Sequence, residues 1–166
     1  MSRALPLIVN GWQIHAHERF LAQFESLIFE VEKLRAKYPD SYQKKAATKR
    51  LEAIYKRAFR DIPQDPTRDE YRQGTTLGDD NKHWFRIKFY QQYRLFFRYR
   101  KEGKLIVLGW VNDPDTKRAY GSKTDAYAVF EKMLESDQLP NDWNALLAAA
   151  RSQDARLNRA VDDLLK

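Results

Sequence analysis

Hydrophobic positions at the start of the chain change from a strand pattern to a helix pattern. The segment from 5 to 15 is rich in apolar residues and is interrupted at Asn10-Gly11, a dipeptide typical of turns, which predicts a short strand with a turn inside it. From Glu18 the apolar residues recur at intervals of three and four, which predicts an amphipathic helix. Its stripe consists of Phe20, Phe24, Leu27, Ile28, Val31 and Leu34.

A second helix is predicted directly after the first. Tyr38-Pro39 ends the first helix, and Asp40 or Ser41 is expected to cap the next one. Since the connection is short, we expect the two helices to pack antiparallel. Residues 63–80, rich in Pro, Asp, Gly and Thr, predict a loop. The apolar line of the second helix is Ala47, Leu51, Ile54, Ala58 and Ile62.

The middle of the chain predicts three strands in close succession. In the segments 84–89 and 93–100, large apolar residues alternate with Arg and Lys, which is the pattern of strands that bury one face. Residues 105–111 are almost entirely apolar and predict a central strand buried on both faces. Gly103 marks a hairpin turn before this third strand.

The rest of the chain predicts helices and completes the fold class. Asn112 and Asp113 end the third strand, where turn formation is their expected role. Thr124 or Asp125 is expected to cap the next helix, and residues 143–166 are again helical, with a break near Ser152. This order predicts an α+β fold in a single domain over residues 1–166. We expect its core at about 5–139 and a C-terminal helical extension at about 140–166.

Composition excludes several classes of protein. With 166 residues, 43% hydrophobic and 13% aromatic, the chain suits one folded domain and not a disordered segment. No apolar run approaches the ~20 residues of a membrane span, and no secretory signal pattern begins the chain, so we expect a cytoplasmic protein without a membrane partner. There is no cysteine and the only histidines are His15, His17 and His83. We therefore expect no disulfide, no metal site and no cofactor.

Positive charge is concentrated in two segments of the chain. The formal net charge is +7, but residues 33–60 carry 10 basic and 2 acidic side chains, and residues 82–104 carry 8 and 1. Acidic stretches lie between and after these segments. The distribution is typical of a directed basic surface that binds a polyanion.

The second basic segment predicts a row of cations on one face of a sheet. Its cations are Arg86 and Lys88 on the first strand and Arg94 and Arg98 on the second. Such a row, with Phe96 among the cations, can clamp phosphates and stack on a base. A two-residue turn would place the two rows on opposite faces, whereas an odd loop or a bulge would bring them together. The alternative is a half-solvated sheet whose cations only keep the protein soluble.

Further candidate residues lie outside this row. Tyr120 and Tyr127 can act as phenolic acids or bases or stack on a base, although an amphipathic place at the edge of a core is the alternative. Arg118 and Lys123 can reach a phosphate or remain free surface charges. His83 is a candidate general base, or a surface residue at the start of a strand. Because the chain has no Gly-rich phosphate loop, serine triad or carboxylate pair, any catalysis must use such Arg, Lys, Tyr and His groups.

Several short motifs resemble the YhaV family of toxins. They extend from residue 10 to about 143, which is nearly the whole chain, and their combination is specific. The motifs are Asn10-Gly11-Trp12, Tyr42-Gln43 with Lys45-Ala46-Ala47-Thr48-Lys49, Tyr93-Arg94-Leu95-Phe96-Phe97-Arg98-Tyr99, Leu108-Gly109-Trp110, Asn112-Asp113, and Tyr120-Gly121 with Lys123-Thr124-Asp125-Ala126-Tyr127.

The resemblance implies the toxin of a type II toxin–antitoxin pair in the RelE/ParE-like superfamily. Its fold would be a small antiparallel sheet with two N-terminal helices packed on it. Its activity would be that of an endoribonuclease that cleaves mRNA in association with the translating ribosome and arrests growth. Its partner would be a PrlF-like antitoxin, a swapped-hairpin DNA-binding protein, and the two together would bind their own operator DNA.

The resemblance also implies a metal-free reaction and a set of site residues. In RelE-like enzymes the 2′-hydroxyl of the substrate attacks the adjacent phosphate, so cations must surround the phosphorane and a proton acceptor and donor are needed. Catalytic roles are implied for Arg86, Lys88, Arg94, Arg118 and Tyr127. RNA binding is expected of Lys82, Trp84, Phe96, Arg98, Tyr120 and Lys123, with Tyr120 or Tyr127 as the tyrosine that stacks on the nucleotide.

Two features depart from the minimal RelE plan, and two other functions stay open. The long loop at 63–83 and the helices after residue 140 are additions that would hold the antitoxin or adapt the protein to the ribosome. One alternative function is a ParE-like topoisomerase poison, although the ParE branch lacks the clustered strand cations. The other is a non-catalytic RNA-binding or ribosome-binding module, which composition alone favours.

Overall fold

A tight hairpin turn begins the computed structural model, which describes residues 5–165. Asn10 and Gly11 form the turn with φ of +51° and +81°, a backbone conformation suited to two-residue hairpin turns. The turn joins β1 (Leu7–Val9) to β2 (Trp12–Ala16), and the two strands pair antiparallel. The predicted strand with an internal turn is therefore a β-hairpin.

The sheet has five strands in the order β1-β2-β5-β4-β3. The predicted meander is confirmed as β3 (Phe85–Phe89), β4 (Tyr93–Arg100) and β5 (Leu105–Val111), and β5 is central and buried along its whole length. However, β2 and β5 pair in parallel, so the sheet is mixed and not antiparallel as the RelE-like plan implied. A parallel pair becomes possible because a long helical crossover separates these two strands in the chain.

The loop between β3 and β4 decides which side chains share a face of the sheet. It has three residues, 90–92, so that Lys88 pairs with Arg94 and Arg86 pairs with Phe96. Because this loop is odd in length, the cations of both strands lie on the same face, and the large apolar residues between them lie on the other. The structure thus takes the odd-loop alternative of the two registers considered from the sequence.

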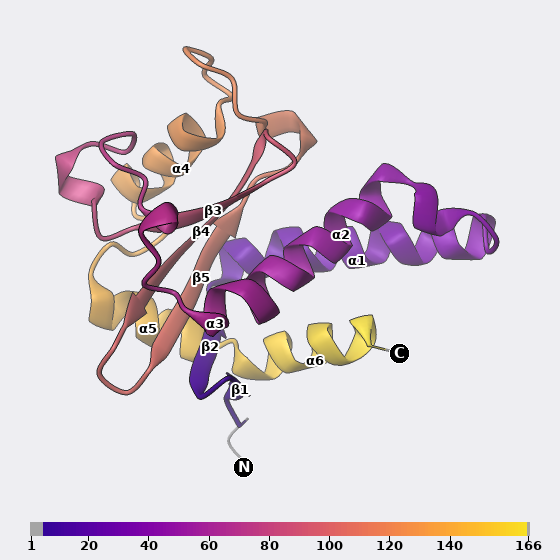
Figure 1. The fold of residues 1–166 in the computed structure, drawn as a ribbon, viewed down its shortest axis with the longest axis horizontal. Coiled ribbons are helices and arrows are strands. Elements are labelled where there is room, and N and C mark those ends of the chain that lie inside the picture. The colour runs from indigo at the N-terminus through magenta and orange to yellow at the C-terminus, as the bar shows by residue number, and fades with distance from the viewer. Residues whose placement is uncertain (1–4, 166) are drawn as a thin grey trace.

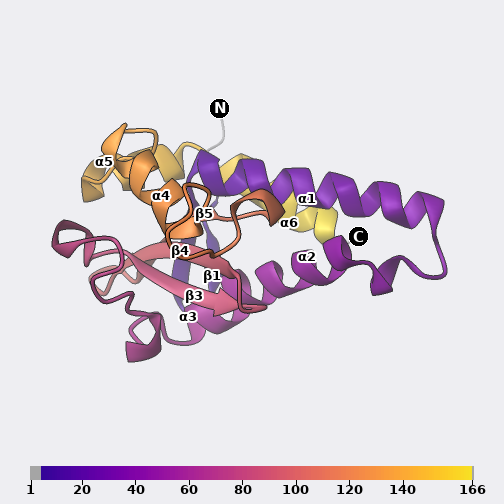
Figure 2. The same ribbon diagram turned by 90° about the horizontal axis from the view of Figure 1, so that it is seen from above.

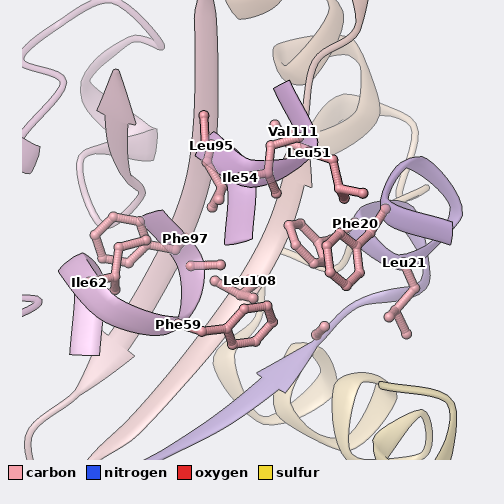
Figure 3. Packing of buried hydrophobic residues seen from close by; sticks show 14 of the residues in the cluster. Phe20, Leu21, Leu51, Ile54, Phe59, Ile62, Leu95, Phe97, Leu108 and Val111 are labelled. Atoms are coloured by element: carbon pink, nitrogen blue, oxygen red, sulfur yellow. The ribbon is translucent and has the colours of Figure 1, made fainter. Parts of the chain in front are cut away.

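Two N-terminal helices cover the apolar face of the sheet, as predicted. α1 (Glu18–Lys37) and α2 (Ala46–Lys56) pack antiparallel, and α6 (Asp154–Leu164) lies beside α1 (Figures 1 and 2). Figure 3 shows their side chains, among them Phe20 and Ile54, directed toward Phe97 and Leu108 of the sheet. Burial of each such side chain stabilises the fold by about 1.5–3 kcal/mol. No helix among residues 5–165 is long and apolar enough to cross a membrane.

The second helix begins later than the sequence predicts. A 3-10 turn (Tyr42–Lys44) follows Ser41, and Lys45 precedes the first residue of α2 without a side-chain capping bond. The expected caps Asp40 and Ser41 are therefore wrong. At its other end α2 continues through a π-helical turn (Arg57–Asp61) into α3 (Ile62–Gln64), which keeps the predicted apolar line buried.

The cation-bearing face of the sheet is also covered by helices. α4 (Ala126–Glu135), capped by Asp125 as one of the two predicted caps, and α5 (Trp143–Arg151) form a second core with Trp84, Phe96 and Phe130. β5 has a bulge at Gly109, opposite Phe96 and Phe97. A glycine is needed there, because a Cβ would lie 2.7 Å from the Trp84 ring of this core. The chain then passes to the opposite face between α5 and α6, at the predicted break.

The loop after α3 is anchored at the edge of the sheet. It contains two 3-10 turns, Asp69–Tyr71 and Asp79–Asn81, and Arg72 forms a bridge with Phe85 of β3. Tyr71 is buried with its ring edge on Phe97. The predicted loop therefore packs on β3, where its main chain can support the side chains of that strand.

Candidate active site

Three arginines and a tyrosine meet on the cation-bearing face near the β3–β4 loop. Nε of Arg86 donates to the hydroxyl of Tyr127 at 3.0 Å, and Nε of Arg94 donates to the same oxygen at 3.2 Å. The guanidinium of Arg118 lies over the Tyr127 ring, 4.6 Å from its centroid. We call Arg86, Arg94, Arg118 and Tyr127 the arginine–tyrosine cluster. All four were predicted from the sequence to be catalytic, and the fold brings them together.

The strand register explains how the cluster forms. Because Lys88 pairs with Arg94, Arg86 and Arg94 are diagonal neighbours on one face, roughly 7–8 Å apart at their backbones. Tyr127 lies in the first turn of α4 and places its hydroxyl between them. Lys88, the fifth predicted catalytic residue, is exposed on β3 opposite Arg94. Lys88 is therefore a further cation beside the cluster, at its open side, where the side chain is exposed to solvent.

One carboxylate fixes both the tyrosine and the third arginine. Asp125 accepts the backbone N–H of Tyr127 at 3.1 Å and that of Ala119 at 2.6 Å, and it forms an ion pair with Arg118 at 2.7 Å. Burial alone would raise the pKa of Asp125, but the Arg118 guanidinium and the amide N–H groups outweigh it and hold the pKa below its ordinary value. Asp125 thus stays ionised while it caps α4.

The two strand arginines are buried without a carboxylate partner. Arg86 and Arg94 are 9% and 7% exposed, and no ion pair within residues 5–165 joins either of them to an acidic side chain. Their other bonds go to main-chain oxygens: Arg86 to Glu70 at 2.7 Å, and Arg94 to Gln91 at 2.7 Å and Tyr93 at 2.9 Å. A buried charge without a counter-ion is costly. A bound phosphate would supply the missing negative charge.

The hydroxyl of Tyr127 is held by two arginines in this geometry. Its oxygen accepts from Arg86 and from Arg94, so both lone pairs are engaged and the O–H remains to be donated. The ring is held edge-on against Phe96 with centroids 5.4 Å apart. The hydroxyl of Tyr127 therefore lies between two guanidinium groups, with the third over its ring.

Asn112 supports the cluster from behind, a role that the sequence did not reveal. Its side chain accepts the backbone N–H of Arg94 at 2.7 Å and donates to the carbonyl oxygens of Gln92 at 3.0 Å and Thr116 at 2.8 Å. The backbone N–H of Arg118 donates to the same Gln92 carbonyl at 2.9 Å. We expected only a turn residue here; the available signal was an Asn directly after a fully buried strand, where every polar atom needs a partner.

A separate group of residues lies further along β4. The guanidinium of Arg98 stands between the rings of Trp84 and Trp143, 5.5 and 5.2 Å from their centroids, and donates to the Asn141 carbonyl at 2.7 Å. Burial lowers the pKa of Arg98 to about 10. His83 contacts the Asn141 side chain at 2.6 Å, and burial lowers its pKa as well. Arg98 lies four residues along β4 from Arg94, about 13 Å, but it is a diagonal neighbour of Arg86 across the Arg86–Phe96 pair.

Two aromatic rings expected to bind RNA are buried instead. Phe96 is fully buried and stacks on Phe130 with centroids 4.1 Å apart, and Trp84 is fully buried beside it. Neither ring offers a free face to a base, which corrects the expectation for both. The reason is that α4 and α5 cover this face of the sheet, and the alternation within the strands does not show which face a later helix will cover.

The remaining candidates are exposed on loops. Tyr120 is 91% exposed, and the Arg118 guanidinium lies 3.8 Å from its ring centroid. Lys123 is exposed on the same loop, whereas Lys82 is exposed on the loop before β3 with Asp79 at 3.4 Å. Of the two tyrosines proposed to stack on a nucleotide, Tyr120 has the accessible ring and Tyr127 has the buried hydroxyl.

The two remaining histidines have structural partners. His17 accepts the backbone N–H of Arg19 at 3.0 Å as the N-cap of α1, and His15 is buried 2.8 Å from Asp154 of α6. Within the part of the chain that the structure describes, no three His, Asp or Glu side chains come together in a group that could hold a metal ion.

Comparisons with known proteins place this site in a family context. A family model described as "Toxin with endonuclease activity, of toxin-antitoxin system" (Toxin_YhaV) matches residues 14–151, which include the whole cluster. Similar curated proteins are "Toxin YhaV" of Escherichia coli O6:H1 and "Ribonuclease toxin YhaV" of Escherichia coli K12. Each is 48% identical over 143 residues, which cover 85% of this chain and 93% of the relative. No solved structure matches the chain significantly.

Proposed function

The chain belongs to the YhaV family of toxins with endonuclease activity in toxin–antitoxin systems, and from this we propose that it is a ribonuclease whose arginine–tyrosine cluster cleaves mRNA. We propose that it acts in the cytoplasm on mRNA held by the translating ribosome, so that translation and growth stop. A PrlF-like antitoxin would neutralise it, and the toxin–antitoxin complex would bind its own operator DNA and repress its promoter.

The observation that carries this proposal is the pair of buried guanidinium groups without a carboxylate. Arg86 and Arg94 are held in place by one phenolic oxygen and by main-chain carbonyl groups, with Arg118 beside them. The planar N–H fork of arginine matches two oxygens of a phosphate diester. A phosphate in this position would receive fixed positive charge from three directions, which is what the phosphorane of RNA cleavage requires.

The reaction that fits these groups is internal transfer at phosphorus. The 2′-hydroxyl oxygen would attack the adjacent phosphorus as its proton passes to solvent water, the bond to the 5′-oxygen would break, and a cyclic phosphate and a 5′-hydroxyl would result. Tyr127 would give its proton to the leaving 5′-oxygen, since its lone pairs are already engaged by two arginines. Lys88 would add positive charge at the open side, and no step in this scheme calls for a metal ion or another cofactor.

The exposed residues near the cluster would hold the rest of the strand. Tyr120 would stack on a base, because its ring is accessible and is positioned by Arg118. Lys123 and Lys82 would contact neighbouring phosphates. Arg98 would act mainly by fixing the end of the sheet between Trp84 and Trp143, as its buried position indicates.

The decisive experiment is primer extension on a defined mRNA, either translated or naked. The proteins compared are wild type, Arg94→Ala, Arg94→Lys and, as a matched control on the same strand, the exposed Arg100→Lys. Arg94→Lys keeps the charge but loses the planar fork, so we expect it to abolish cleavage while ribosome association, measured by co-sedimentation, stays nearly intact. Arg100→Lys should cleave like wild type.

Two results would contradict the proposal. Wild-type cleavage by Arg94→Lys would remove Arg94 from the catalytic residues. An absence of cleavage by wild type in both settings, together with binding to ribosomes or to gyrase, would favour an inhibitor that acts by occupancy, which includes the RNA-binding module and the topoisomerase poison.

A further inference from the structure

The α1–α2 hairpin extends far beyond the sheet. A helix rises 1.5 Å per residue, so the 20 residues of α1 span about 30 Å, and only the first part lies against the strands (Figures 1 and 2). Buried residues of α1 end at Val31, and those of α2 begin at Ala47. We call residues 33–49 the hairpin tip. Of the tip, only Ala47 is buried, and Leu34 and Tyr42 pack partly against the main core, so the charge of the tip is not explained by packing.

The hairpin tip is strongly and openly basic. It has six basic side chains and one acidic one, Asp40. The six cations are all exposed: Lys33, Arg35, Lys37, Lys44, Lys45 and Lys49. Within residues 5–165 no ion pair engages any of them; the ion pair closest along the hairpin, Arg50 with Glu30 at 3.8 Å, lies at its inner boundary. These charges are therefore available to a ligand.

Exposed aromatic rings support the ammonium groups of the tip. Lys33 lies 4.7 Å from the Phe29 ring centroid, and Tyr38 is approached by Lys45 at 4.3 Å and by Lys37 at 5.4 Å. Phe29 and Tyr38 are 59% and 37% exposed. A ring holds an ammonium group by its quadrupole without neutralising it. The ring contacts thus hold these lysines at the surface of the tip without an ion pair to a carboxylate of residues 5–165.

The β3–β4 loop connects the arginine–tyrosine cluster to the hairpin. The hydroxyl of Tyr90 in this loop donates to the carbonyl oxygen of Lys49 at 3.4 Å, and the neighbouring Gln91 carbonyl accepts from Arg94 at 2.7 Å. The guanidinium of Arg50 lies 5.8 Å from the ring of Tyr93, where β4 begins. A long polyanion can therefore lie across the loop and reach the cluster and α2 at once.

We propose that the hairpin tip is a second RNA-binding surface, which binds the phosphate backbone of a folded RNA helix while the cluster holds the strand to be cut. The part of this proposal that concerns RNA cleavage at the cluster rests on the proposed function. Five of the six cations are lysines, compact point charges that bind phosphates without the fork that reads bases. A protruding helical end also fits rows of phosphates on a duplex, whereas single strands are usually bound in grooves.

The test compares a tip variant with a matched control variant. The tip variant carries Lys33→Gln, Lys37→Gln and Lys45→Gln, and the control carries Lys101→Gln, Lys104→Gln and Lys132→Gln, which are exposed lysines elsewhere with the same change of charge. Binding of a labelled, fully paired RNA hairpin is measured by fluorescence anisotropy between 50 and 200 mM salt. Over this range the affinity falls steeply with salt when the contacts are made to phosphates. Each lost contact should lower the slope of log K against log salt by roughly one unit.

We expect the tip variant to lose about tenfold or more in affinity and about two to three units of slope, and the control variant to lose little. Equal losses in the two variants would overturn the inference. The same binding measurement is made with a DNA duplex of the same sequence and with an acidic peptide used as a substitute for an antitoxin segment. If the tip variant loses affinity only for one of these two ligands and not for the RNA hairpin, the inference is also overturned.

The same measurement separates this inference from the proposed function. Binding needs no cleavage, so Arg94→Ala should bind the RNA hairpin as wild type does. If tip-dependent binding occurs in a protein that cleaves no RNA, the proposed ribonuclease activity fails and the binding surface stands. If cleavage depends on Arg94 but hairpin binding does not depend on the tip lysines, the ribonuclease stands and the second surface fails.

Discussion

A single phenolic oxygen organises the candidate site at the scale of residues. Without Tyr127, two guanidinium groups on diagonal positions of the sheet would face each other with no acceptor between them. Like charges at such a separation repel, and their Nε–H groups would lack a partner inside the fold. The oxygen therefore both stabilises the pair and orients it, while neither guanidinium has a carboxylate partner within residues 5–165. In the proposed function, this costly arrangement is the site that receives the phosphate.

Tyr127→Phe should separate the catalytic role of this oxygen from its structural role. We expect cleavage to fall by roughly 10²–10⁴-fold, because the proton donor is lost. We expect the free energy of unfolding to fall by about 1–3 kcal/mol, because two buried donors lose their acceptor. RNA cleavage and urea unfolding measure the two effects, with Tyr99→Phe on the same sheet as the control. Unchanged cleavage would remove Tyr127 from the proposed mechanism.

The N-terminus of α4 sets the site at the scale of elements. Asp125 ends the loop that carries Arg118, caps the helix and thereby fixes the first turn in which Tyr127 lies. The cap, the ion pair and the position of the phenol therefore depend on the same carboxylate. Loss of the charge at Asp125 should weaken all three. An N-cap contributes typically about 1 kcal/mol, and its Asn substitute retains most of that.

Asp125→Asn should change the pH dependence of stability. Because the pKa of Asp125 in the folded protein is lowered below its unfolded value, its ion pair stabilises the fold above the unfolded pKa and is lost as the pH falls through the folded pKa. We expect the variant to be less stable by about 1–3 kcal/mol near neutral pH. The difference from wild type should shrink below about pH 4, the usual range of an aspartate. Urea unfolding at several pH values measures this; a gap that stays constant into acid would contradict it.

Periodicity identified most elements, and its failures have physical causes. The stripes of α1 and α2 and the alternation in β3 and β4 follow directly from side-chain geometry, so those elements were predicted. The parallel pairing of β2 with β5 depends on where a distant crossover returns, and the burial of Phe96 depends on α4, which lies more than twenty residues later. The register was left open because only the loop at 90–92, with positive φ at Tyr90 and Gln91, decides it. Local patterns do not contain such information.

The candidate site was predicted in part for the same reason. The five predicted catalytic residues came from the resemblance and from the row of cations. The fold gathers four of them in the cluster, with the exposed Lys88 beside it on β3. Asn112 was missed because a buried amide and a turn-forming amide look alike in a sequence. Its function depends on three main-chain groups from separate segments. Residue type therefore indicated the chemistry, and the fold decided which groups share a site.

At the scale of the whole molecule, the C-terminal helices belong to both cores. The sequence predicted an extension after residue 140, but α5 packs in the second core and α6 packs against α1 in the first (Figure 2). His15 of β2 contacts Asp154 at the start of α6, and Arg156 binds Glu25 of α1 at 2.6 Å. The two faces of the sheet are thereby joined by one continuous segment. Destabilising α6 should consequently destabilise the sheet that carries the cluster.

Leu157→Ala tests whether α6 is part of this platform or an independent addition. Leu157 is almost fully buried in the main core, so its truncation leaves a cavity and should lower the free energy of unfolding by about 2–5 kcal/mol. Leu165→Ala, at an exposed leucine just beyond the same helix, should change it by less than about 0.5 kcal/mol. Urea unfolding followed by far-ultraviolet circular dichroism and by tryptophan fluorescence distinguishes the cases. If α6 is integral, both signals should shift together in Leu157→Ala, since three of the four tryptophans belong to the second core, on the opposite face from α6. A shift in circular dichroism alone would show that α6 melts separately and that the sheet and its cluster fold without it.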